Sequence, residues 1–186
     1  MPTLASRPPR SESIDLELES ILTSFDTSYV WNYGNVKEGL RDLYEKAKRE
    51  QWNATAQLAW DTPVDPESEI ISQSFNPLAD WEPFRKLAPK EVLHFQHAQL
   101  SWSLSQFMHG EQGALITASQ LVGAVPWIDA KYYAASQTMD EARHVEVFSR
   151  YLREKLEWEW PINENLKKLL DLILQDSRWD LSLIHI

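Results

Sequence analysis

Glu111 is the residue of this 186-residue chain whose surroundings point most directly to chemistry. At about 100° per residue of an α-helix, a set of apolar residues falls within about 40° of it on one face. They are Leu100, Leu104, Phe107, Leu115, Ala118, Val122 and Val125. A buried carboxylate is unfavourable unless a cation or hydrogen bonds compensate its charge. The sequence therefore predicts a partner for Glu111, which could be a metal ion, an arginine or a hydrogen bond at a helix bend.

Glu141 and His144 form a Glu-x-x-His pair in a second helical pattern. One face of that pattern carries Ala134, Glu141, Val145, Phe148 and Leu152. The spacing brings a carboxylate and an imidazole to about 5–6 Å from each other, so both can bind one cation. Such pairs are common by chance, but together with Glu111 this one predicts a metal site made of Glu111, Glu141 and His144. Carboxylate oxygens with one imidazole suit iron or manganese better than zinc or calcium.

Composition limits the other kinds of site and partner. The chain has no cysteine, which excludes disulfides, thiolate-bound zinc and iron–sulfur clusters. A net charge of −10 without a basic run argues against nucleic-acid binding. No apolar stretch approaches the roughly 18 residues of a membrane helix, and the N-terminus lacks the apolar segment of a secretory signal. We expect a cytoplasmic protein with neither nucleic acid nor membrane as a partner.

We expect helices to hold these residues, because the sequence has no period-2 alternation of strand length. The patterns predict an all-α fold, most simply an antiparallel helical bundle. We expect a disordered arm over residues 1–12, a helical domain over 13–180 and an irregular tail over 181–186. Within the domain the expected helices cover about 13–25, 36–52, 89–125, 129–160 and 163–176, and 53–78 is expected to be a surface loop. Pro126 and Pro161 are expected to end the two long helices.

Two segments carry a resemblance to a known family. His109-Gly-Glu-Gln-Gly-Ala-Leu115 and Met139-Asp-Glu-Ala-Arg-His-Val-Glu-Val-Phe148 resemble the ferritin-like di-iron carboxylate superfamily, in its branch of ribonucleotide-reductase-like proteins and bacterial oxygenases. The resemblance covers about residues 36–180. It implies a ferritin-like bundle that binds two iron ions, or manganese and iron, with Glu111 as the ligand from one helix and Glu141 and His144 as those from the next.

The resemblance also implies a function. It suggests an oxidoreductase that activates O2 to oxidise a small organic substrate, with an electron donor that the sequence does not identify. Asp140 is then expected to support the site by hydrogen bonding a histidine of its other half. The alternative for Asp140 is a solvent-facing ion pair with Arg143. Phe148 occupies the position where radical-storing reductase subunits have tyrosine, which disfavours a reductase subunit of that kind.

The family pattern continues with another glutamate and a second Glu-x-x-His, which do not follow here. Glu91-Val-Leu-His94 lies on the same expected helix as Glu111, about 30 Å away for its glutamate at 1.5 Å per residue. His97 lies about 20 Å from Glu111 on the same basis. We therefore interpret His94 and His97 as structural residues, so this chain is expected to supply half of the metal ligands.

Two explanations are open for the other half. The chain could be the N-terminal portion of a longer oxygenase-like protein, or a homodimer could complete the site across a two-fold axis. Two functions compete with an oxidoreductase: a ferritin-type protein that oxidises or stores iron, and a metal-free helical fragment that acts as an interaction module. Activity in this chain alone is therefore conditional on a source for the missing ligands.

Overall fold

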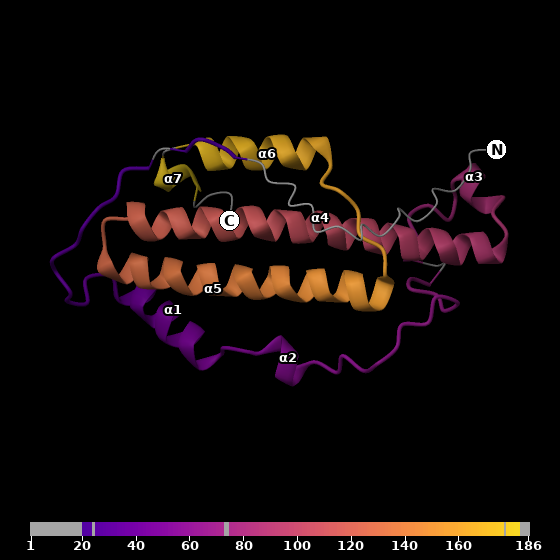
Figure 1. Ribbon diagram of the computed structural model, residues 1–186, viewed down its shortest axis with the longest axis horizontal. Coiled ribbons are helices and arrows are strands. Elements are labelled where there is room, and N and C mark those ends of the chain that lie inside the picture. The colour runs from indigo at the N-terminus through magenta and orange to yellow at the C-terminus, as the bar shows by residue number, and fades with distance from the viewer. Residues whose placement is uncertain (1–19, 24, 73–74, 177, 183–186) are drawn as a thin grey trace.

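The computed structural model describes residues 20–23, 25–72, 75–176 and 178–182, and within that part of the chain it contains helices and no strands. The all-α prediction is therefore confirmed (Figure 1). The helices are α1 (Glu38–Arg49), α2 (Ala54–Gln57), α3 (Glu82–Arg85), α4 (Pro89–Ala124), α5 (Ile128–Tyr151), the π-helical turn η2 (Leu152–Leu156), α6 (Glu164–Gln175) and α7 (Trp179–Ser182). None of the described helices combines the length and the apolar character that crossing a membrane requires.

The two longest helices, α4 and α5, form an antiparallel hairpin at the centre of the molecule (Figure 1). On the outer side of α4 lies α6, and on the outer side of α5 lies α1. Pro89 begins α4, where its missing N–H costs no hydrogen bond, and α4 ends just before Pro126. Lys131 of α5 donates to the carbonyl oxygens of Val122 and Gly123, both at 2.8 Å, and so satisfies the C-terminal end of α4.

The most deeply buried side of α4 differs from the stripe that the helical pattern indicates. Of that stripe only Ala118 and Val125 are buried, whereas the Phe107 side of the helix faces solvent. Small or polar residues are buried instead on a neighbouring face of α4, among them Gln96, Ser101, Ser105, Gln106 and Thr117. They can be buried because their polar atoms form hydrogen bonds, which a hydrophobicity pattern does not register. Thr117 donates to the Gly113 carbonyl of its own helix, and the others pair with other segments of the chain.

The partner of this polar face is the segment 157–163, which runs across α4. Ser101 donates to the carbonyl of Trp158, and the amide of Trp160 donates to Ser105 Oγ at 3.0 Å. Gln106 accepts from the amide of Asn163 at 2.8 Å and donates to the Pro161 carbonyl at 2.9 Å. These bonds replace helical ones, so the expected helix 129–160 ends earlier than predicted.

The end of that helix lies at Leu156, where the backbone turns. Glu157 has a φ of 50°, in the left-handed region, and it stops the helix about four residues before Pro161 could. Trp158 and Trp160 then stack on each other at 5.4 Å between ring centroids. Burial of Trp158 against α4, with Trp160 partly buried beside it, favours the early stop over continued helix. The predicted helices 36–52, 89–125 and 163–176 are confirmed as α1, α4 and α6, with slightly shorter bounds.

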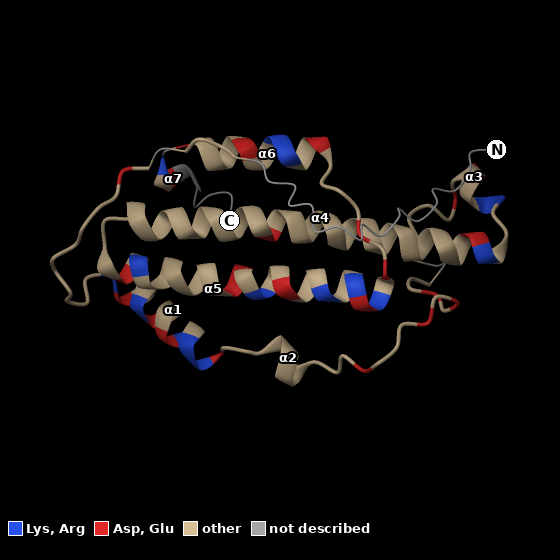
Figure 2. Ribbon diagram, viewed as in Figure 1, with Lys and Arg blue, Asp and Glu red and all other residues tan. Residues whose placement is uncertain are grey.

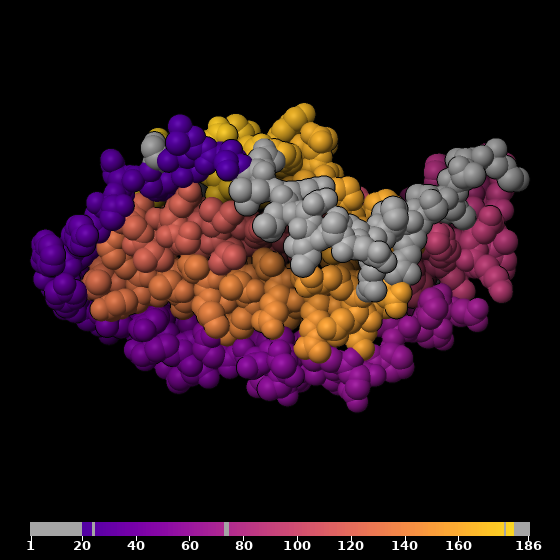
Figure 3. All heavy atoms as spheres, in the orientation of Figure 1, coloured from indigo at the N-terminus to yellow at the C-terminus, as the bar shows by residue number. Residues whose placement is uncertain are grey.

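The N-terminal part corrects another prediction. Residues 20–23 and 25–37 are not helical, so the expected helix over 13–25 is wrong where the structure describes it; its first residues and the expected arm 1–12 lie outside the described residues. The segment instead passes over the end of the α4–α5 hairpin (Figure 3), and the Ser28 amide donates to the Gly123 carbonyl at 3.0 Å. Two further details differ: the expected loop 53–78 contains the short α2, and α7 extends into the expected tail.

Asp129, in the first turn of α5, joins α1 to the central hairpin. Its fully buried carboxylate accepts from the amides of Val36 and Lys37 at 2.9 Å each and from Arg41 Nε at 2.6 Å. Burial alone would raise the pKa of Asp129, but the hydrogen bonds from Lys37, Val36 and Arg41 together hold it below its ordinary value. Tyr44 of α1 stacks on Tyr132 of α5, which continues the same contact.

We predict that Asp129→Asn lowers the thermal unfolding temperature at neutral pH, because the charge-assisted bonds to Arg41 and the α1 amides are lost. Since the folded pKa of Asp129 lies below the unfolded one, its stabilisation is present above the ordinary value of 3.8 and disappears as the pH falls through the folded pKa. The difference between the variant and the wild type should therefore shrink in acid. Thermal unfolding followed by circular dichroism measures this, with the exposed Asp80→Asn as the control.

Candidate metal centre

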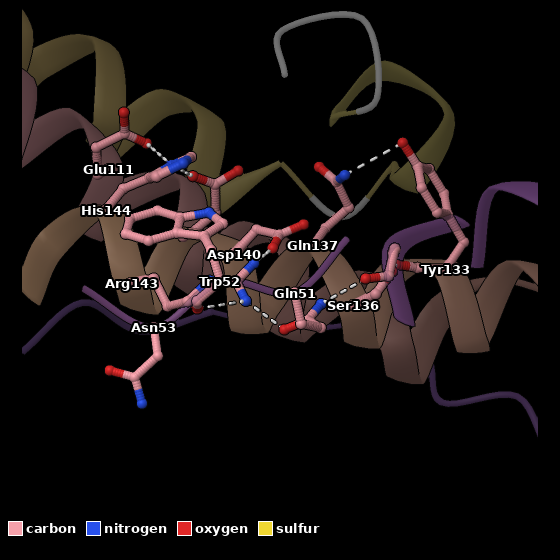
Figure 4. Close-up of polar contacts among 12 residues, drawn as sticks. Gln51, Trp52, Asn53, Glu111, Tyr133, Ser136, Gln137, Asp140, Arg143 and His144 are labelled. Carbon is pink, nitrogen blue, oxygen red and sulfur yellow. Dashed lines mark hydrogen bonds and ion pairs between the residues drawn. The ribbon is translucent and has the colours of Figure 1, made fainter. Parts of the chain in front are cut away.

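Glu111, Glu141 and His144 meet between the two central helices. Glu111 comes from the middle of α4, and the other two lie one turn apart on α5 (Figure 4). His144 Nδ1 lies 2.9 Å from Glu141 Oε2 and 3.5 Å from Glu111 Oε2. One donor atom from each of the three side chains lies within 4.8 Å of the others. The predicted convergence is confirmed, and this group of residues could hold a metal ion.

The exposure of the three side chains shows how the site opens. Glu141 is the most buried, with 11% of its side chain exposed, whereas Glu111 is 27% and His144 41% exposed. Beyond the first turn of α4, which contains Lys90 and Glu91, Glu111 is the one Asp, Glu, Lys or Arg of the helix (Figure 2). Of the three side chains, His144 is the most accessible to solvent.

The electrostatics of the group favour a cation. Partial burial raises the pKa of Glu111, and the adjacent Glu141 raises it further through a hydrogen bond and its negative charge, while His144 acts in the opposite direction. Two carboxylates that share a partly buried site repel each other when both are ionised. A divalent ion would satisfy both carboxylates and remove that repulsion. Two oxygen ligands and one imidazole also leave coordination positions open for water, O2 or further ligands.

The segment after α1 covers the outer side of His144. The Trp52 ring lies 6.4 Å from the His144 ring between centroids, and the guanidinium of Arg143 lies 5.2 Å from the Trp52 centroid. Arg143 donates to the side chain of Gln51 and to the Trp52 carbonyl (Figure 4). The sequence patterns did not identify Trp52 and Gln51. They follow the end of α1 and carry no motif; a tryptophan in an otherwise polar stretch is the one signal that could have indicated them.

Asp140 forms an ion pair with Arg143, which is the alternative that the sequence analysis gave for it. The pair does not face solvent, however, because the Arg143 side chain is only 8% exposed and lies under Trp52. Asp140 lies next to Glu141 in the chain and fixes the arginine that holds Trp52 against His144. A bond from Asp140 to a histidine of a second half-site stays a prediction.

The other acidic and histidine residues of α4 have structural partners. Glu91 accepts from the amide of Ala88 at 2.7 Å and thereby caps the helix. The ring of His94 packs on Trp158 at 5.1 Å, and His97 Nε2 lies 3.2 Å from the carbonyl oxygen of Ser68. Among the described residues, Glu111, Glu141 and His144 form the one cluster of three or more such side chains close enough to share an ion.

We predict that Glu111→Gln stabilises the metal-free protein at neutral pH, because it removes a charge that burial and Glu141 disfavour. The pKa of Glu111 is raised in the folded state, so its contribution to stability is full below the ordinary value of 4.5 and is lost as the pH rises through the folded pKa. The gain in unfolding free energy of Glu111→Gln over the wild type should thus grow from acid to neutral pH. Chemical unfolding in excess chelator measures it; Glu146→Gln, exposed on α5, is the control and should give no such trend.

Comparisons with known proteins give no relative from which a function could be carried over. No family model matches the chain, and neither the curated proteins nor the solved structures contain a significant match. The candidate metal centre therefore depends on its own geometry, which brings two carboxylates and one imidazole together on adjacent antiparallel helices.

Proposed function

We propose that this chain belongs to a ferritin-like, non-haem oxidoreductase that uses two iron ions, or manganese and iron, to activate O2 and oxidise a small organic substrate. One observation carries the proposal. A carboxylate in the middle of one long helix meets a Glu-x-x-His pair on its antiparallel neighbour, with donor atoms within 4.8 Å. That arrangement is half of the ligand set found in di-iron helical bundles, where each half contributes one such set.

The metal ions, when bound, would supply the redox chemistry and the activation of O2. The protein's own residues would do the rest. Glu111 and Glu141 would neutralise the ions, and His144 Nδ1, which faces both carboxylates, would bind in place of its present contact with Glu141. Because protons must leave these groups before a metal can bind, affinity should increase with pH. Trp52 and Arg143 would keep the His144 ring in position.

A ferritin-type iron protein is the nearest competitor, and a metal-free interaction module is the other. A ferritin-type centre takes ligands from four helices of one subunit, whereas the described residues supply one cluster from two helices. A metal-free module would leave Glu111 and Glu141 in repulsion without a compensating ion. The donor set thus favours a metal-dependent function, and the presence of bound metal is the first point to test.

We predict that Fe(II), added without oxygen, and Mn(II) stabilise the protein against thermal unfolding. A ligand that binds only the folded state adds about 2.7 kcal/mol when its free concentration is 100-fold above its Kd. Glu141→Ala or His144→Ala should abolish this gain, because each leaves two of the three donors. The measurements are unfolding with and without metal, and metal content by elemental analysis after gel filtration.

The matched control is Glu146→Ala, which removes an exposed carboxylate of the same helix and should leave metal binding unchanged. Unfolding in chelator shows whether each variant remains folded, so loss of metal is separated from loss of structure. Equal metal content in the wild type and in Glu141→Ala would disprove the site. Absence of metal from the wild type would favour the metal-free module.

The partner that completes the centre can be tested through stoichiometry. If two copies join across a two-fold axis, each giving Glu111, Glu141 and His144, metal should drive dimerisation with two ions per dimer. Sedimentation velocity with and without Mn(II), combined with metal analysis, measures this. A protein that stays monomeric with metal bound would exclude the dimer.

A further inference from the structure

An apolar pocket of about 300 Å³ lies between α4 and α5, beside the candidate metal centre. We call it the α4–α5 pocket. Small and aliphatic side chains of the two helices form its walls, and aromatic and amide side chains form its ends. The principal lining residues are Ala118, Leu121, Trp127, Tyr133, Gln137 and Trp179. Trp127 and Trp179 meet edge to face at 6.0 Å and close the end distant from the metal centre.

The position of the pocket relative to the metal ligands follows from helix geometry. On α5, Gln137 lies one turn before Glu141, and on α4, Ala118 lies two turns after Glu111, in both cases on the same face. One turn advances about 5.4 Å along a helix. Because α4 and α5 are antiparallel, both offsets point to the same side of the metal centre. A molecule in the pocket would therefore have its Gln137 end next to the three ligands.

The chemistry of the lining restricts what can bind. None of the lining residues that the structure describes has a charged side chain. Lys131, which follows the pocket residue Ala130, directs its ammonium to the carbonyls that end α4. A charged ligand would lose its hydration here without a compensating partner, so the pocket should exclude ions.

Two polar side chains mark the metal-side end of the pocket. Gln137 Nε2 donates to the Tyr133 hydroxyl at 3.1 Å (Figure 4). That bond fixes the Gln137 amide and leaves its carbonyl oxygen, together with the Tyr133 hydroxyl hydrogen, to bond one polar group of a ligand. A volume of about 300 Å³ is at the small end of ligand pockets, which range over roughly 300–1,000 Å³. It suits a molecule with one aromatic ring.

We infer that the α4–α5 pocket binds a small, uncharged aromatic molecule with one hydrogen-bonding substituent directed at Gln137. As the identification of a substrate, this inference rests on the proposed oxidoreductase function, since it puts the substituted end of the ring beside the metal ligands. As a binding site, the pocket does not require metal. Aromatic side chains provide flat apolar contacts for the ring, and Gln137 selects its orientation.

The test uses the full chain in excess chelator, so that no metal contributes. Aniline and benzyl alcohol serve as uncharged probes, toluene lacks the polar substituent, and benzoate carries a charge. We expect saturable binding of aniline or benzyl alcohol by saturation-transfer NMR and calorimetry, and binding of benzoate that is weaker by roughly tenfold or more. Absence of binding by both uncharged polar probes, or benzoate binding as tightly as they do, would overturn the inference.

Two variants place the binding in this pocket. Ala134→Leu, on the α5 wall, adds methyl groups to the pocket and should weaken binding by roughly tenfold, because the added volume displaces the ligand. Its matched control is Ala135→Leu, the exposed neighbour on the same helix, which should bind as the wild type does. Equal binding by Ala134→Leu and the wild type would overturn the assignment.

Gln137→Leu covers the case in which Ala134→Leu does not fold. It should remove the preference for aniline and benzyl alcohol over toluene while toluene binding persists; an unchanged preference would overturn the role of Gln137. Failures of the two proposals are distinguishable. Aromatic binding in a protein that never takes up metal supports the pocket and removes the oxidoreductase function, whereas metal uptake with no aromatic binding overturns the pocket alone.

Discussion

Two carboxylates, Glu111 and Glu141, share a partly buried space between α4 and α5, and the rest of the molecule is arranged around that contact. Burial and mutual repulsion raise the pKa of Glu111, and the imidazole of His144 offsets this only in part. A protein core does not normally keep such a pair without a cation, because packed apolar side chains would be at least as stable there. Keeping the two carboxylates together lowers the stability of the metal-free protein. Metal binding by the three side chains would explain why they are kept, since a divalent ion satisfies both charges at once.

The α5 helix contacts α1 and the segment that follows it along its length, from its first turn to the candidate metal centre. Asp129 in its first turn holds the start of α1, and the stacked Tyr44 and Tyr132 continue the contact. The path of α1 then brings Trp52 over Arg143 and against His144. The contacts of Asp129 at the start of α1 and the contact of Trp52 with His144 after its end thus both join this part of the chain to α5. The α4–α5 pocket lies between these two regions, so the same helix pair lines the ligand site and supports the metal centre.

The part of α4 that contacts the segment 157–163 is stabilised in a different way. Ser101, Ser105 and Gln106 are buried because the segment 157–163 presents backbone groups that satisfy them. The bonds hold the chain after η2 against α4 and lead into α6, which Asn163 caps. One face of α4 is thus fixed by hydrogen bonds, and the other remains available for Glu111 and the pocket. Rigid support on one side allows a charged residue to be kept in place on the other.

The helices α1, α4 and α6 could be predicted from the sequence, because proline positions and helical periodicity are local properties. The three residues of the candidate metal centre could be predicted as well, because Glu-x-x-His spacing puts two donors on one helical turn. The predicted buried face was confirmed for Glu141, whereas most of the apolar stripe around Glu111 is only partly buried or exposed. The end of η2 depends on tertiary contacts, because left-handed Glu157 and the burial of Trp158 outweigh the helical pattern that continues to Pro161. Only the tertiary structure brought Trp52 to His144 and opened the pocket beside Gln137, because these contacts join residues distant in the chain, and no local pattern encodes which surfaces meet.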